Sequence, residues 1–106
     1  LDRARASQQE IAGEDLFFGK ARCVTCHQPP AYTDHMLHDL FLERFGAEAD
    51  GPIKSFALRG IKDSPPYLHD GRLLTLEDTV EFFNLVAGLQ LNGDEKSALV
   101  AFMRAL

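Results

Sequence analysis

Apolar residues near the end of the chain recur at the spacing of one helical face. These residues are Leu99, Phe102, Met103 and Leu106. Upstream of them, Asn92 is followed three residues later by Glu95, a pairing that is typical of the first turn of a helix. The pattern therefore predicts an amphipathic last helix over residues 92–106.

A second helix is predicted near the start of the chain. Ser7 and Glu10 form a capping box, and the helix is expected to run from residue 7 to about residue 20. Gly13 and Phe17 lie four residues apart and so share one face of it. Because a glycine on that face lets another helix approach closely, we expect the first and last helices to cross near Gly13.

A third helix is predicted where Thr75 is followed three residues later by Asp78. Its apolar stripe consists of Leu76, Val80, Phe83 and Ala87. A short helix is also expected over residues 40–45, and no segment shows the alternation that is typical of a strand. Turns that contain proline or glycine separate these segments. The pattern therefore predicts an all-α fold with long loops between the helices.

Composition and charge narrow the class of protein without changing this picture. The 106 residues fit a single domain, residues 1–106, and 45% apolar and 25% charged residues are ordinary for a globular protein. A net charge of −5 argues against nucleic acid or an anionic membrane surface as a partner, and no apolar run reaches transmembrane length. The chain begins at Leu1 with neither an initiator Met nor a signal peptide, so we expect a processed chain or a part of a larger protein.

The strongest chemical signal is a string that holds both cysteines of the chain, Cys23-Val24-Thr25-Cys26-His27. The C-x-x-C-H spacing indicates c-type haem attachment. In such a site the two sulfurs bond to neighbouring vinyl groups as thioethers, and the histidine that follows is the proximal iron ligand. One covalent haem would add a large apolar plate to a small core, which explains how long loops can stay ordered.

Other uses of these cysteines account for the string less well. A structural zinc site usually takes four ligands from two separated pairs, and the sequence has no second cysteine pair. A thioredoxin-like redox pair needs a βαβ context, which the flanking sequence does not show. A plain disulfide would leave His27 without a role. Haem attachment uses all three side chains.

Further strings occur in a characteristic order from Gly13 onward. They are GEDLF at 13–17, PPAYTD at 29–34, HD at 38–39, ALRG at 57–60, PYLHDG at 66–71, TLED at 75–78 and EKSALVAF at 95–102. In this order they resemble the C-terminal haem domain of bacterial di-haem cytochrome c peroxidases and of their MauG-type relatives. The PYxHDG string followed by TLED is specific to that family.

The resemblance implies a class I cytochrome c-like fold wrapped around one covalently attached haem. It also implies a periplasmic oxidoreductase in which one haem meets peroxide and another relays electrons, so a second haem domain or a redox partner protein is expected. Arg59 and Tyr67 match family positions that pack near the haem, and Arg59 suits a haem propionate by its charge and planar fork.

The family's calcium site uses carbonyls that match Ser64 and Pro66 but is completed from the other domain. Calcium binding by this chain is therefore doubtful.

The sequence departs from the family at the sixth position of the iron. Eight residues after the Thr of the TLE string, the peroxidases have a Met and MauG-type relatives a Tyr, whereas this chain has Phe83. Because phenylalanine cannot ligate iron, we expect a five-coordinate or water-bound site, with the sixth ligand unknown. His69, in the PYxHDG loop, is the candidate for a distal acid–base group. Other side chains able to bind iron are expected in loops or in the core: Met36, His35, His38 and Met103.

These features are compatible with two classes of function. An electron relay needs a buried haem that reorganises little on reduction. An enzyme needs an open iron site and a distal acid–base group. We expect electron transfer as part of a larger peroxidase or MauG-like oxidoreductase, with peroxidase activity of this haem, or binding of a diatomic ligand, as the alternatives.

Overall fold

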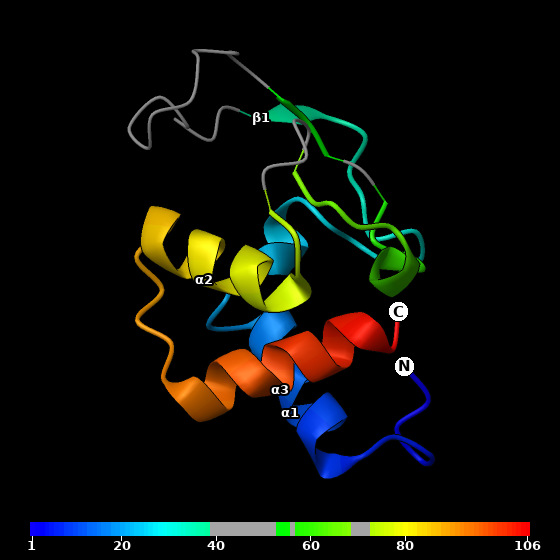
Figure 1. Ribbon diagram of the computed structural model, residues 1–106. Helices are drawn as coiled ribbons and strands as arrows, with labels where there is room; N and C mark the ends of the chain where they lie inside the picture. Colours follow the sequence, from blue (N-terminus) through cyan, green and yellow to red (C-terminus); the bar gives the residue numbers. More distant parts are fainter. Residues whose placement is uncertain (39–52, 56, 69–72) are drawn as a thin grey trace.

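The computed structural model describes residues 1–38, 53–55, 57–68 and 73–106. The predicted short helix over residues 40–45 and His69 lie outside the described residues. Its elements are α1 (Gln8–Phe18), η1 (Cys23–Thr25), β1 (Leu37–His38), β2 (Ile53–Lys54), η3 (Ile61–Asp63), α2 (Leu76–Val86) and α3 (Gly93–Arg104). Figure 1 shows the three α-helices gathered on one side, which we call the helical side. The described parts of residues 22–38 and 53–68 form the loop side.

Helix α1 begins where the capping box predicts. The Ser7 hydroxyl accepts a hydrogen bond from the backbone N–H of Glu10 at 3.0 Å, and the Glu10 carboxylate accepts one from the backbone N–H of Ser7 at 3.4 Å. The helix ends before Gly19, whose N–H bonds to the carbonyl of Leu16. The buried residues of α1 are Gly13 and Phe17, which confirms the predicted face.

Helix α3 also begins at its predicted cap. The side-chain oxygen of Asn92 accepts from the N–H of Glu95 at 2.8 Å, and the Glu95 carboxylate accepts from the N–H of Asn92 at 2.9 Å. Its buried residues are Ala98, Leu99, Val100, Phe102 and Met103. Met103 therefore belongs to the core, as expected.

Helices α1 and α3 cross at Gly13. A Cβ atom built on this glycine would lie 1.9 Å from the carbonyl oxygen of Ala98 and 2.8 Å from the Cβ of Phe102. No side chain fits at those distances, so the two backbones are as close as a glycine allows. The predicted crossing of the first and last helices is confirmed.

Helix α2 is capped by Thr75, whose hydroxyl accepts from the N–H of Asp78 at 3.0 Å. Leu76 and Val80 are buried and Phe83 is half-buried, in agreement with the predicted stripe. The inclusion of Ala87 in that stripe is wrong: the helix ends at Val86, and Ala87 is the exposed C-cap.

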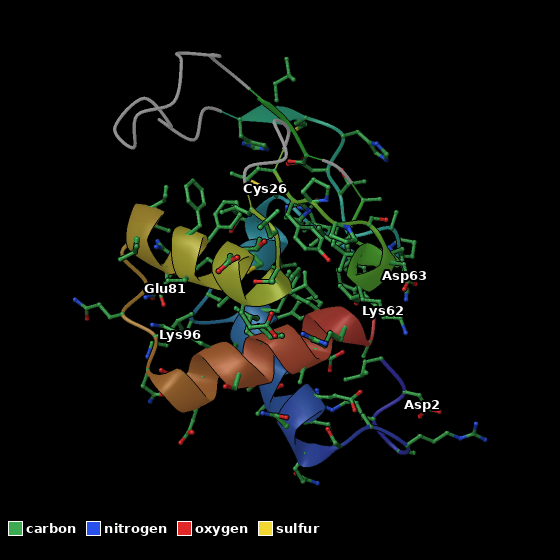
Figure 2. The ribbon with its side chains drawn as sticks, in the orientation of Figure 1. Asp2, Cys26, Lys62, Asp63, Glu81 and Lys96 are labelled. Carbon is green, nitrogen blue, oxygen red and sulfur yellow. The ribbon has the colours of Figure 1, made fainter. Side chains whose placement is uncertain are left out.

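Two ion pairs connect α2 to α3. Lys96 donates to the carboxylate of Glu81, and Arg104 donates to Glu77 at 2.6 Å. Figure 2 shows Glu81 and Lys96 between the two helices. Glu77 is exposed and Glu81 is half-exposed, so both pairs lie at the surface of the molecule.

A small antiparallel ribbon on the loop side was not expected. In it, Leu37 of β1 pairs with Lys54 of β2, and His38 pairs with Ile53. Strands of two residues are too short to show an alternating pattern, so sequence periodicity could not reveal them. The other regular elements of the described residues are helices, and none of these helices is both long and apolar enough to cross a membrane.

An aromatic cluster joins the two sides of the molecule. The ring of Phe17 lies 5.2 Å from that of Phe102 and 5.6 Å from that of Tyr32, in edge-to-face arrangements. Phe17 and Phe102 come from the crossing helices, whereas Tyr32 comes from the loop side. This cluster fixes the loop that follows the C-x-x-C-H string against the helical core.

Candidate functional site

The C-x-x-C-H string forms a single tight turn directly after α1. Helix η1 (Cys23–Thr25) follows Arg22, and the carbonyl of Cys23 accepts from the N–H groups of Cys26 and His27 at 3.2 and 3.0 Å. Upstream, the N–H of Ala21 bonds to the carbonyl of Leu16 at 2.8 Å, which ties the turn to the end of the helix. Both thiols and the imidazole therefore leave the backbone from one short, hydrogen-bonded unit. Figure 2 shows Cys26 among the loop segments beyond α2.

The two cysteines are free thiols that resist ionisation. Burial raises the pKa of Cys23 to about 12. Burial, followed by the negative charge of Asp34, also raises the pKa of Cys26. Redox-active and nucleophilic cysteines have lowered pKa values, because the thiolate is the reactive form. The electrostatics of this turn are thus unlike those of a thioredoxin-type pair.

The imidazole of His27 is oriented by a backbone carbonyl. Its Nδ1 lies 2.7 Å from the carbonyl oxygen of Tyr32. Because a carbonyl oxygen can only accept, Nδ1 carries the proton and the ring lone pair is on Nε2. This is the tautomer that a histidine needs in order to ligate a metal through Nε2 while its other nitrogen is held by the protein. The residues of the turn therefore fit a c-type haem.

Arg59 lies beside the same loop. Its Nε donates to the carbonyl of Pro30 at 2.8 Å, and its guanidinium carbon lies 5.2 Å from the centre of the Tyr32 ring. The side chain is exposed. Its expected role as a partner of a haem propionate stays a prediction.

Tyr67 is buried under the segment that leads to α2. Its hydroxyl donates to the carbonyl of Ile61 at 3.0 Å, and its backbone forms an isolated bridge with Leu73. It thereby ties η3 (Ile61–Asp63) to the segment that precedes α2. Whether it also contacts a haem stays a prediction.

Phe83 is half-buried on α2, on the stripe that holds Leu76 and Val80. Its ring stands edge-on to that of Phe82, with a centroid distance of 5.3 Å. Of the other side chains able to bind iron, Met103 is buried in the core, whereas Met36 and His35 are exposed in the loop side.

One polar cluster beside the turn was not found from the sequence. Nε2 of His38 is hydrogen-bonded to Oδ2 of Asp34 at 2.7 Å, and the Cys26 sulfur lies within 4.8 Å of the ligand atoms of both. The pKa of the Asp34 carboxyl is lowered, first by the N–H of Met36 and then by hydrogen bonds from His38 and Ser55. The four-residue spacing of Asp34 and His38 is visible in the sequence, but only the fold brings them to Cys26. A thioether at Cys26 would remove the thiolate that a metal ion would need there.

Sequence comparisons relate the whole chain to cytochrome c peroxidases and MauG. No protein-family model matches. The chain is 30% identical to cytochrome-c peroxidase IdrP2 of Denitromonas iodatirespirans, with 99% of this chain and 41% of that protein covered. It is 33% identical to cytochrome c551 peroxidase of Nitrosomonas europaea (99% and 36% covered). It is 29% identical to methylamine utilization protein MauG of Methylorubrum extorquens (96% and 32% covered). The chain thus spans about two fifths or less of these relatives.

A comparison of folds points to the same group of proteins as the sequence comparisons. A solved structure of a MauG-like protein associated with microbial copper homeostasis matches with a TM-score of 0.82 and 23% identity, covering 99% of this chain and 48% of that one. The fold is thus shared with that protein, and the turn carries the cysteines and histidine of a c-type haem motif. The predicted resemblance is confirmed: the chain is related to the family of cytochrome c peroxidases and MauG proteins. That relationship implies a c-type haem and a redox role.

Proposed function

We propose that this chain is a c-type cytochrome domain with a class I cytochrome c-like fold and one covalent haem. Cys23 and Cys26 attach the haem, and His27 ligates its iron. Its role is electron transfer within a larger oxidoreductase of the peroxidase and MauG type. The observation that carries the proposal is the turn itself, in which His27 donates Nδ1–H to the Tyr32 carbonyl, so that Nε2 carries the ring lone pair.

The residues of the turn suit this chemistry in several ways. A bound haem supplies a one-electron Fe(III)/Fe(II) couple. Each thiol adds across one vinyl double bond, so its sulfur bonds to one carbon and its hydrogen ends on the other. The raised pKa values of Cys23 and Cys26 keep both thiols neutral and limit competing disulfide exchange before attachment.

The length of the relatives supports a partner for this domain. Because the chain covers only 41% of one peroxidase and 36% of another, those proteins have room for a second domain of similar size. A second haem domain, or a separate redox protein, would exchange electrons with this haem. The periplasm is the expected location, since the resemblance is to periplasmic oxidoreductases.

The test is whether the chain keeps its haem when unfolded. Mass spectrometry of the denatured protein should find one haem added, and the double variant Cys23→Ala/Cys26→Ala should lose it. The control is His35→Ala, which removes an exposed histidine outside the turn and should retain the haem. Colour that is lost to acid–organic extraction, or zinc in place of iron, would contradict the proposal.

A second candidate function rests on Phe83. A phenyl ring at the expected sixth position would leave the iron open to peroxide or to a diatomic ligand, and His69 would be the acid–base group. We then expect a high-spin ferric spectrum and ready binding of cyanide. His69→Ala should lower the rate of reaction with peroxide while cyanide binding is largely kept.

The chain offers a matched pair of variants for this candidate. Phe83→Met should give a low-spin haem that resists cyanide, because the thioether would reach the iron. Phe82→Met changes the neighbouring, also half-buried ring and should leave the spin state alone. A wild-type protein that is already low-spin, or an equal response of both variants, would rule out an open site beside Phe83.

A further inference from the structure

Tyr32 holds a backbone conformation that bulky residues rarely adopt. Its φ is +61°, in the left-handed region, although the residue is not a glycine. The side chain is only 3% exposed, and its ring packs edge-on against Phe17 and Phe102 at 5.6 and 6.2 Å. Such a conformation persists only where the surroundings impose it. The same residue supplies the carbonyl that accepts from His27.

Arg59 contacts this loop at two points. Its Nε donates to the carbonyl of Pro30 at 2.8 Å, and its guanidinium lies over the Tyr32 ring, 5.2 Å from the ring centre. One contact holds the backbone two residues before Tyr32, and the other covers one face of the Tyr32 ring. Helices α1 and α3 cover the ring from within, so Arg59 completes the enclosure from outside.

We propose that Arg59 is a positioning residue for His27. By clamping residues 30–32 it keeps the Tyr32 carbonyl at 2.7 Å from Nδ1, which fixes the plane and the tautomer of the imidazole. A strongly held Nδ1 proton makes Nε2 a better electron donor. Such a donor favours Fe(III) and lowers the reduction potential. The inference rests on the proposed role of His27 as the iron ligand.

This positioning role and a purely electrostatic role of Arg59 predict opposite changes in the reduction potential when Arg59 is removed. If Arg59 acts only through its positive charge, as a propionate partner would, then removing the charge favours Fe(III) and lowers the potential. If Arg59 acts as a clamp, then releasing it weakens the Tyr32–His27 hydrogen bond and raises the potential. Arg59→Lys separates the two effects, because lysine keeps the charge but has neither the Nε donor nor the planar fork.

The experiment compares Arg59→Lys with Arg104→Lys in the full protein with haem attached. Arg104 is the matched control, since it is exposed and its guanidinium pairs with Glu77 on α2. The two readouts are the midpoint potential and the hydrogen-exchange rate of the His27 Nδ1–H. NMR measures the latter in a diamagnetic ferrous state, which is the reduced protein if low-spin and its carbon monoxide complex if high-spin.

For Arg59→Lys we expect a higher midpoint potential and exchange about tenfold faster. That factor is the size expected when the hydrogen bond from Nε to the Pro30 carbonyl is lost. Arg59→Ala should accelerate exchange at least as much, and Arg104→Lys should change neither readout.

Two outcomes overturn the inference while the haem proposal stands. One is unchanged exchange in Arg59→Lys, with or without a lower potential. The other is an equal response in Arg104→Lys, which would point to a general effect of losing an arginine. A wild-type protein without covalent haem, or one whose iron is still ligated normally in His27→Ala, overturns the proposed function and this inference together.

Discussion

The helical side and the loop side of this molecule are ordered by different means. On the helical side, Gly13 brings two backbones together and the rings of Phe17 and Phe102 are fully buried. On the loop side, individual hydrogen bonds hold backbone segments whose φ angles are unusual. Apart from Gln90, the described non-glycine residues with positive φ all lie there: Arg22, Tyr32, His35 and Leu68.

The difference shows where function and stability reside. Left-handed backbone at residues other than glycine costs free energy and is retained where surrounding contacts impose it, often beside functional groups. Arg22 directly precedes the C-x-x-C-H turn, and Tyr32 accepts from His27. The helical side therefore supplies the stability that allows the loop side to hold these conformations.

The largest expected effect comes from removing the ring that both sides share. Phe102→Ala takes away a fully buried ring that contacts Phe17 and Tyr32, and should lower the free energy of unfolding by about 4 kcal/mol. Chemical denaturation measures it. Leu85→Ala, at a position on α2 that is 64% exposed, is the control and should change stability by less than about 0.5 kcal/mol. Similar losses for both variants would show that the shared aromatic cluster is not what joins the two sides.

A slightly smaller loss is expected at the crossing of α1 and α3. In Gly13→Ala the added methyl group would meet the Ala98 carbonyl, so the helices must separate, which costs about 2–3 kcal/mol through overpacking. Gly93→Ala is the matched control, because a methyl group added there would meet nothing within 4 Å and the φ of Gly93 is not left-handed. If Gly13→Ala melts at the same temperature as Gly93→Ala, the close approach is not required for stability.

The features that sequence reasoning found are those encoded by neighbouring residues. Ser7, Thr75 and Asn92 were identified as helix caps because each bonds within its own first turn. The approach of α1 to α3 was also predictable, since a glycine on the apolar face of a helix usually marks the place where another backbone packs against it. Ala87 was misplaced because the periodic pattern does not say where a helix stops.

The contacts around the candidate site were less accessible to sequence reasoning. His27 is held by a backbone carbonyl. Any residue at position 32 would carry that carbonyl, so the identity of Tyr32 does not predict the contact. Arg59 reaches Pro30 across 29 positions of sequence. Pairing at that distance depends on the path of the loop side, and no local pattern specifies that path.

A moderate loss of stability is expected from removing a helix cap on the helical side. Asn92→Ala leaves the N–H of Glu95 without its side-chain acceptor and should lower the free energy of unfolding by about 1 kcal/mol. Asn92→Ser keeps an acceptor at this position and should recover most of the loss. Thermal unfolding of both variants measures the difference. Equal destabilisation by serine and alanine would mean that the asparagine acts through something other than capping.

The smallest effect is expected from acid, acting on the loop side through Asp34. The pKa of Asp34 is lowered chiefly by the N–H of Met36, which donates to its carboxylate at 2.8 Å. A carboxyl whose pKa is lower in the folded state contributes stability above its ordinary pKa of about 4 and loses it as the pH falls through the lowered value. Hydrogen exchange corrected for intrinsic rate should therefore show the Met36 amide losing protection over that range.

The neighbouring His35 amide is the internal control for this loss. It donates at 3.0 Å to the Thr33 hydroxyl, which does not titrate in acid, so its protection should fall less than that of Met36. Asp34→Asn removes the charge while keeping an oxygen acceptor, and it should abolish the pH dependence at Met36 without exposing the whole loop. If both amides lose protection in parallel in the wild type, acid opens the segment as a unit. In that case His38 and Ser55, which also bond to Asp34, would have to hold the loop side as strongly as the Met36 amide does.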